Sequence, residues 1–183
     1  MKKLLLLSIL NFSFLIFTCL AQQQNHFTHF TIDDGLSQSS VFSITQDDFG
    51  FMWFATEDGL NKFDGNRFTI YRPKQNDTTS LPDLGIRKIY KDKSGKLWVL
   101  TLRGKLCRYN PQKNNFTRYS FNTDKQNIAI KIITVAEDNL GNLWAVTTKG
   151  EFFNFDQKKN IFIYKSLMKI LKNNFNQFTC NVY

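Results

Sequence analysis

The sequence has few of the residues from which most enzyme sites are built. It contains two histidines and three cysteines among 183 residues, with no glycine-rich phosphate loop, no Cys-x-x-Cys pair and no Gly-x-Ser-x-Gly elbow. His26 and His29 are three residues apart in a segment expected to be a strand, so their side chains point to opposite faces and do not share a metal ion. Acidic pairs such as Asp47-Asp48 occur in expected turns, where carboxylates bind backbone N–H groups. We therefore expect no catalytic residue, no metal site and no cofactor.

The cysteines do not predict a disulfide. Cys107 lies in an alternating segment and Cys180 lies three residues from the end of the sequence. No spacing supports a bond between them, and two unpaired thiols are the simpler expectation.

The N-terminus has the pattern of a secretory signal peptide. Lys2 and Lys3 precede a mostly apolar run that ends at Leu20, and Ala21 supplies a small residue at the expected cleavage point. An uncleaved membrane anchor and a lipoprotein signal with lipid on Cys19 are the alternatives. Residues 1–21 therefore predict export to the periplasm or beyond, with membrane contact only through this segment.

Three tryptophans recur in one ten-residue frame. Trp53, Trp98 and Trp144 are separated by 45 and 46 residues, and each lies in the frame Asp-x-x-Gly-x-x-Trp-x-x-Thr, with a further glycine three residues later. The repeated residues, which we interpret as structural, are Asp47, Gly50, Trp53, Thr56, Gly59, Asp92, Gly95, Trp98, Thr101, Gly104, Asp138, Gly141, Trp144, Thr147 and Gly150. Each Asp can accept hydrogen bonds within its turn, each Gly can adopt a positive φ, and each Trp is expected in the core.

The repeat length predicts the fold class. Each unit contains four short segments of strand character separated by turn residues, and a period in the mid-forties is that of one four-stranded propeller blade. We expect an all-β partial β-propeller with about three four-stranded antiparallel blades plus a stray N-terminal outer strand around Phe27 and Phe30. The predicted divisions are a signal peptide (1–21), an N-terminal strand and lead-in loop (22–40), blade 1 (41–71), blade 2 (86–119), blade 3 (130–165) and the truncated start of a fourth repeat (166–183).

Charge suggests only a broad class of partner. The chain carries a formal net charge of +9, with basic clusters interleaved with aromatic residues. Export argues against a nucleic-acid partner, and solvated blade edges account for most of the charge. An acidic polysaccharide or the anionic envelope surface is the partner that this charge would favour.

Several segments resemble the two-component regulator propeller repeat, and more narrowly the periplasmic sensor region of Bacteroidetes-type hybrid two-component histidine kinases. The matching segments are Gly35-Leu36-Ser37-Gln38-Ser39-Ser40-Val41, Gly50-Phe51-Met52-Trp53-Phe54-Ala55-Thr56 and Asp58-Gly59-Leu60-Asn61-Lys62-Phe63-Asp64-Gly65. The resemblance implies further propeller blades, a membrane helix and a histidine kinase in the intact relative, which detects glycan breakdown products. No kinase motif follows the third repeat, so the resemblance implies a sensor fragment that does not signal by itself.

Two functions remain open at this stage. The first is a non-catalytic, ligand-sensing propeller fragment that binds a glycan-derived ligand through loops 33–40, 57–59, 74–84 and 102–104. The alternative is a truncated exported propeller enzyme of the lyase or lactonase type. Such an enzyme needs convergent His, Asp or Glu side chains near its inner strands, and segments 41–46, 86–91 and 132–137 contain no histidine.

Overall fold

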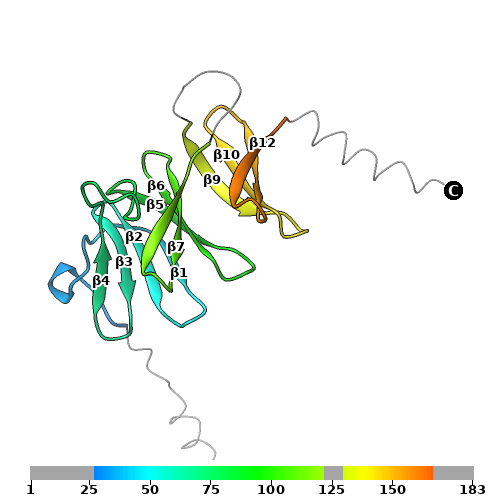
Figure 1. Cartoon of the computed structure of the whole chain (residues 1–183). Coiled ribbons are helices and arrows are strands. Elements are labelled where there is room, and N and C mark those ends of the chain that lie inside the picture. The colour runs from blue at the N-terminus through cyan, green and yellow to red at the C-terminus, as the bar shows by residue number, and fades with distance from the viewer. Residues whose placement is uncertain (1–26, 122–129, 167–183) are drawn as a thin grey trace, which may run out of the picture.

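The computed structural model describes residues 27–121 and 130–166, which form twelve β-strands and one short 3₁₀-helix (Figure 1). The helix is η1 (Ile32–Asp34). The strands are β1 (Val41–Gln46), β2 (Met52–Thr56), β3 (Gly59–Phe63), β4 (Phe68–Tyr71), β5 (Ile86–Lys91), β6 (Leu97–Thr101), β7 (Leu106–Asn110), β8 (Asn115–Tyr119), β9 (Ile132–Glu137), β10 (Leu143–Thr147), β11 (Phe152–Asp156) and β12 (Ile161–Lys165).

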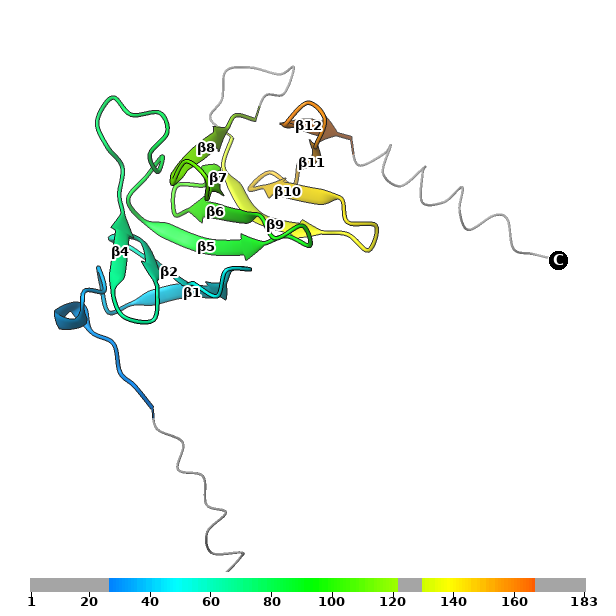
Figure 2. The ribbon, with the colours of Figure 1, turned by 60° about the horizontal axis from the view of Figure 1, so that its bottom comes forward.

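The strands form three separate four-stranded antiparallel sheets. Their orders are β1-β2-β3-β4, β5-β6-β7-β8 and β9-β10-β11-β12, so every sheet is an unbroken meander of consecutive strands. The first strands of successive sheets lie side by side, with β1 against β5 and β9 next to the second sheet (Figure 2). This arrangement is that of successive propeller blades, and the predicted fold class is confirmed.

The middle sheet is buried on both of its faces, one against the first sheet and one against the third. Strand β6, in the middle sheet, is buried along its whole length. Val99 belongs to the core shared with the first sheet, whereas Trp98 and Leu100 belong to the core shared with the third. Side chains alternate across a strand, so a continuous apolar run such as Leu97–Leu100 is expected where both faces are covered.

The tryptophans lie on the face that each sheet presents to the next one. The Trp53 and Trp98 side chains are 0% exposed. Trp53 packs against Tyr109 of the second sheet with ring centroids 4.7 Å apart. Trp98 packs against Phe155 of the third sheet at 5.0 Å. The expectation that the tryptophans lie in the core is thus met for Trp53 and Trp98, and each packs at an interface between two sheets.

Trp144 is only half-buried, although its sequence frame is the same. It occupies the equivalent place in the third sheet, and no further sheet lies against that face within residues 27–121 and 130–166. Burial of the tryptophan is therefore a property of the interface between sheets and not of the single repeat.

The predicted N-terminal outer strand is wrong for the described part of the lead-in. Residues 27–31 make no ladder with any of the three sheets, and η1 follows directly, begun by a Thr31–Asp34 capping box. A strand needs a partner for its backbone N–H and C=O groups, and all three sheets already contain four strands. Phe30 instead packs against Phe63 and Phe68, at centroid distances of 4.8 and 5.6 Å.

Several predictions concern residues outside the described ranges. These are the signal peptide 1–21, residues 167–183 of the fourth repeat, Cys19, His26 and Cys180. Cys107 is a buried free thiol, and burial raises its pKa. Neither described range contains a helix that is long and apolar enough to cross a membrane.

Candidate functional site

The predicted binding loops lie at one common end of the sheets. In an antiparallel meander, the turn between the second and third strands and the link from the fourth strand to the next sheet emerge on the same side. Contacts in the structure join these loops: the Arg72 guanidinium reaches Asp58, and the Leu102 N–H donates to the Gly85 carbonyl at 2.9 Å. Loops 33–40, 57–59, 74–84 and 102–104 therefore share one face, which we call the loop face.

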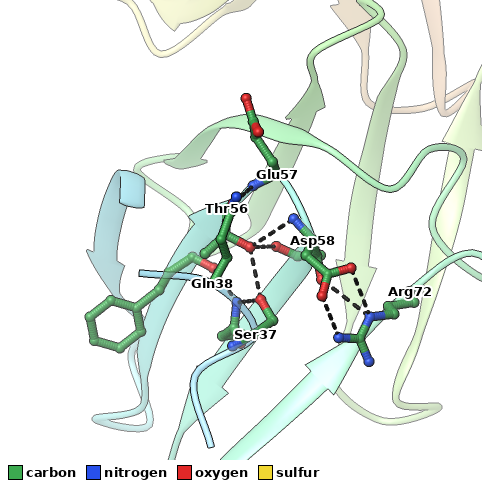
Figure 3. Close-up of polar contacts among 9 residues, drawn as sticks. Ser37, Gln38, Thr56, Glu57, Asp58 and Arg72 are labelled. Atoms are coloured by element: carbon green, nitrogen blue, oxygen red, sulfur yellow. Dashed lines mark hydrogen bonds and ion pairs between the residues drawn. The ribbon is translucent and has the colours of Figure 1, made fainter. Parts of the chain in front are cut away.

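A polar network joins the lead-in loop to the first sheet on this face (Figure 3). The Ser37 hydroxyl lies 2.8 Å from the Thr56 hydroxyl, and the Ser37 N–H donates to Oδ1 of the fully buried Asn61 at 2.9 Å. The Gln38 side-chain carbonyl accepts from the Glu57 N–H at 3.0 Å. These contacts use Gln38 Oε1, so the Gln38 amide NH₂ and the exposed Glu57 carboxylate, which points away from the network, are candidate ligand contacts.

Asp58 and Arg72 form an ion pair at the edge of the network. Arg72 donates from Nη2 to Asp58 Oδ2 at 2.7 Å, and the two side chains are 46% and 40% exposed. The hydrogen bond to Asp58 raises the pKa of Arg72. A pair this exposed contributes little to stability, since solvent screens its charges. Its geometry instead presents a fixed guanidinium and carboxylate to solvent on the loop face.

The lead-in element is repeated before the second sheet, which the sequence analysis did not recognise. Leu36 and Leu81 are both buried at the entrance to their sheets. In the second unit, the Thr101 hydroxyl donates to Asp83 Oδ2 at 2.8 Å, in the place where Ser37 meets Thr56 in the first. The 45-residue step between Leu36 and Leu81 is the sequence signal that could have indicated this repeat.

A single arginine fixes the link between the first two sheets. Arg118 in β8 donates to the carbonyls of Asp77, Ser80 and Leu81, each at 2.9 Å. Lys74 N–H also donates to the Ser80 hydroxyl. This loop is therefore held in one shape next to the candidate contacts of the first sheet.

The repeated aspartates carry out two tasks at the opposite end of each sheet. In each frame, Oδ1 accepts the N–H groups two and four residues ahead, which closes the turn. Oδ2 accepts the indole N–H of the tryptophan six residues ahead, at 2.8 Å for Trp53 and Trp98 and 2.9 Å for Trp144. The first task was predicted from sequence and the second was not. The turn glycines Gly50, Gly95 and Gly141 have φ values of 87°, 79° and 80°.

The repeated threonines and their glycines form the second turn of each unit, on the loop face. Thr56, Thr101 and Thr147 are buried, and each hydroxyl accepts a backbone N–H of its own turn. Gly59, Gly104 and Gly150 follow with positive φ. At Gly104 an added Cβ would lie 2.9 Å from the Lys131 Cα, so the next segment passes too close for any larger residue.

Asp138, one of the three repeated aspartates, is expected to make the stability of the fold depend on pH. Burial acts to raise the pKa of Asp138, but hydrogen bonds from Trp144, Asn142 and Leu140 outweigh it and lower the pKa from 3.8 to about 2. A lowered pKa in the folded state contributes stability that is present above pH 3.8 and is lost as the pH falls through 2. We expect the difference in Tm between the native chain and Asp138→Asn to shrink between pH 5 and pH 2, followed by circular dichroism. A difference that stays constant over this range would contradict the assignment.

No group of three or more His, Cys, Asp or Glu side chains in residues 27–121 and 130–166 is arranged to hold a metal ion. The loop face offers hydrogen-bond donors and acceptors and two ion pairs, Asp58–Arg72 and Asp83–Lys105, which suit the recognition of a polar ligand.

The comparison with known sequences and structures defines the class of protein. Residues 35–58 and 80–103 match the two component regulator propeller family. Both matched segments run from a lead-in loop through the first two strands of a sheet, which is the unit seen in the structure. These two segments are therefore similar to two-component regulator propeller repeats.

The similar proteins include a histidine kinase and extracellular domains of hybrid two-component systems. The chain is 50% identical over 82 residues to Histidine kinase P4 of Formosa agariphila, covering 44% of this chain and 6% of that protein. It is similar to the extracellular domain of the hybrid two component system BT3049 from B. thetaiotaomicron, with 30% identity, a TM-score of 0.66, and coverage of 79% of this chain and 20% of that one. A second such domain, BT4673, gives 26% identity and a TM-score of 0.62, covering 79% of this chain and 21% of that one. The chain thus spans about one fifth or less of these relatives.

Lyases with a propeller fold are also similar, but less so. The virginiamycin B lyase of Staphylococcus aureus has 17% identity and a TM-score of 0.50, covering 69% of this chain and 41% of that one. A likeness at this level shows the fold alone. Strands β1, β5 and β9 contain no histidine, and their one acidic residue is Glu137 at the end of β9.

Proposed function

We propose that this chain is a non-catalytic, ligand-sensing propeller segment of an exported two-component sensor. The observation that carries the proposal is the joint presence of the sensor repeat in sequence and of its sheet arrangement in space. The extracellular location of the related domains supports a location outside the cytoplasm. Signal transmission belongs to the kinase of the relatives, so we expect no signalling from this chain without further domains.

The ligand that we propose is glycan-derived and binds on the loop face. Support comes from the outward groups of Gln38 and Glu57 and from the exposed Asp58–Arg72 pair, which together offer donors and acceptors to hydroxyl groups. The buried Thr56 and Asn61 hold this surface from below. A polar surface that is already ordered loses little conformational entropy on binding.

Thermal shift of the chain against a panel of neutral and acidic oligosaccharides tests this function. We expect at least one oligosaccharide to raise Tm, because a ligand that binds only the folded state stabilises it. Gln38→Ala and Glu57→Gln are expected to reduce that shift by at least half, since both remove outward groups without touching the core. Asn139→Ala, an exposed change in a turn at the other end of the third sheet, is the matched control and should leave the shift unchanged. The proposal fails if no oligosaccharide raises Tm, or if the loop-face variants respond like Asn139→Ala.

A further inference from the structure

A groove lies between the first two sheets, at the end opposite the loop face. It consists of a cavity of about 550 Å³ and an adjoining one of about 280 Å³, which share Phe51, Lys62, Tyr109 and Pro111 as common walls. The larger cavity continues to Asp48 at its inner end and to Asn110 at its outer end. Its volume falls within the range of about 300–1,000 Å³ that is usual for small-molecule sites.

Three basic residues line the groove, Lys62, Lys96 and Arg108, and Lys62 lies closest to an aromatic ring. Lys62 Nζ lies 3.6 Å from the centre of the Phe51 ring and within 6.0 Å of the Tyr109 ring. No carboxylate in the described part of the chain is within ion-pair distance of Lys62. The nearby acids are already engaged: Asp48 pairs with Lys91 at 2.8 Å, and both Asp47 oxygens accept N–H groups. A half-buried ammonium held over an aromatic ring is therefore available to an anionic group.

Apolar and polar groups line the groove together with this cation. Phe49, which lines the groove, is 71% exposed and offers an aromatic face. The side-chain oxygen Oδ1 of Asn110 accepts from the Gln112 and Lys113 N–H groups, so the side-chain NH₂ of Asn110 remains available to donate. Asp48, only partly covered by Lys91, can accept hydroxyl protons at the inner end.

The aromatic residues depart from the repeat in a way that the turn does not require. Phe49 stands where the other units have Ser94 and Leu140, and Phe51 stands where they have Lys96 and Asn142. The hydrogen bonds of the Asp-x-x-Gly turn are the same in all three units. Phe49 and Phe51 are therefore not needed to form the turn, and both line this groove together with Lys62.

We propose that this groove binds an acidic sugar. The carboxylate of the sugar contacts Lys62, and the apolar face of the sugar ring stacks on Phe49. An acidic sugar is the class that matches every part of the groove, because it combines a carboxylate, a C–H face for aromatic stacking and hydroxyl groups for Asp48 and Asn110. A charged hydrogen bond from Lys62 supplies the selectivity for the acid over its neutral counterpart. The groove is separate from the loop face, so this inference stands or fails independently of the proposed function.

Titration of the chain with D-galacturonate, D-galactose and acetate, followed by NMR amide shifts, tests the proposal. We expect galacturonate to shift amides in 49–51 and 110–112 in a saturable way, and galactose to bind at least tenfold more weakly. Lys62→Gln should make the two sugars bind equally weakly, and Phe49→Ala should weaken galacturonate binding at least fivefold. Lys158→Gln and Leu140→Ala are the matched controls in the third sheet, and both should bind galacturonate like the native chain. Circular dichroism of each variant confirms that it is folded.

Three results would overturn the proposal. Equal binding of galactose and galacturonate would remove the role of charge. Acetate shifts that match those of galacturonate would reduce the groove to an anion site with no sugar recognition. Retention of the preference for galacturonate in a folded Lys62→Gln protein would place the carboxylate elsewhere.

Gln38→Ala and Glu57→Gln should leave galacturonate binding unchanged, which separates this groove from the loop face.

Discussion

Replacing Trp98 with alanine is expected to lower the free energy of unfolding by about 3–5 kcal/mol, the usual cost of removing a large buried aromatic side chain. The Trp98 indole is 0% exposed and lies between two sheets, with Tyr119 at 5.2 Å on its own side and Phe155 and Phe162 at 5.0 and 5.7 Å on the other. Its removal opens a cavity that two rigid sheets cannot close without shifting. Urea unfolding followed by far-UV circular dichroism measures the loss.

Trp144→Ala is the matched control for this prediction. Trp144 has the same frame and the same hydrogen bond to its aspartate, but it is half-buried because no described sheet covers it. We expect less than half of the loss seen for Trp98→Ala, since the transferred apolar area is smaller. Equal losses in the two variants would mean that the tryptophan stabilises its own sheet and not the interface between sheets.

Asp92→Asn is expected to lower the free energy of unfolding by about 1–3 kcal/mol through an unsatisfied buried donor. Oδ1 of Asp92 accepts from the Ser94 and Lys96 N–H groups, both at 2.9 Å, and Oδ2 accepts from the Trp98 indole at 2.8 Å. Asparagine has one carbonyl oxygen, so its NH₂ must face either the indole N–H or the turn N–H groups. Two donors then point at each other in a buried position, and chemical denaturation measures the cost.

Asp156→Asn provides the control for the loss of charge. Asp156 also closes a turn, but only its Oδ1 accepts, from the Lys158 and Lys159 N–H groups. Asparagine can keep this one acceptor, so the change should stay within about 0.5 kcal/mol. If Asp92→Asn proved as mild as Asp156→Asn, the second carboxylate oxygen would have no structural role.

The sequence predicts the sheets well because their determinants are local. Alternation and turn residues place the inner strands at 41–46, 86–91 and 132–137, where the structure has β1, β5 and β9. The Asp-x-x-Gly pattern also predicts the turn hydrogen bonds and the positive φ of Gly50, since both arise within a few residues. Repetition of a local pattern three times made the fold class clear.

Contacts between sheets could not be predicted, because they depend on how one repeat meets the next. Tyr71 in β4 donates to the side-chain oxygen of Asn114 in the next sheet at 2.6 Å, and Tyr119 donates in the same way to Asn160 at 3.0 Å. Both asparagines have positive φ in their turns, which the sequence does not distinguish from other polar turn residues. The prediction of an N-terminal outer strand was wrong for a similar reason, because a β-strand forms only where the edge strand of a sheet is available to pair with it.

Of the two candidate binding surfaces, the loop face could be predicted from the sequence and the groove could not. The loop face could be predicted because meander topology alone places its loops together, and contacts such as Arg72 to Asp58 are found there. The groove at the opposite end could not be predicted, because it depends on the packing of Lys62 over Phe51 and on the approach of Pro111 from the next sheet.

Nuclear Overhauser contacts of the Trp98 indole test most directly whether successive repeats pack as propeller blades. The account predicts cross-peaks from the indole protons to the ring protons of Phe155 and Phe162, which lie in the next repeat at centroid distances of 5.0 and 5.7 Å. Cross-peaks confined to residues of the sheet that contains Trp98, in a folded protein, would contradict it.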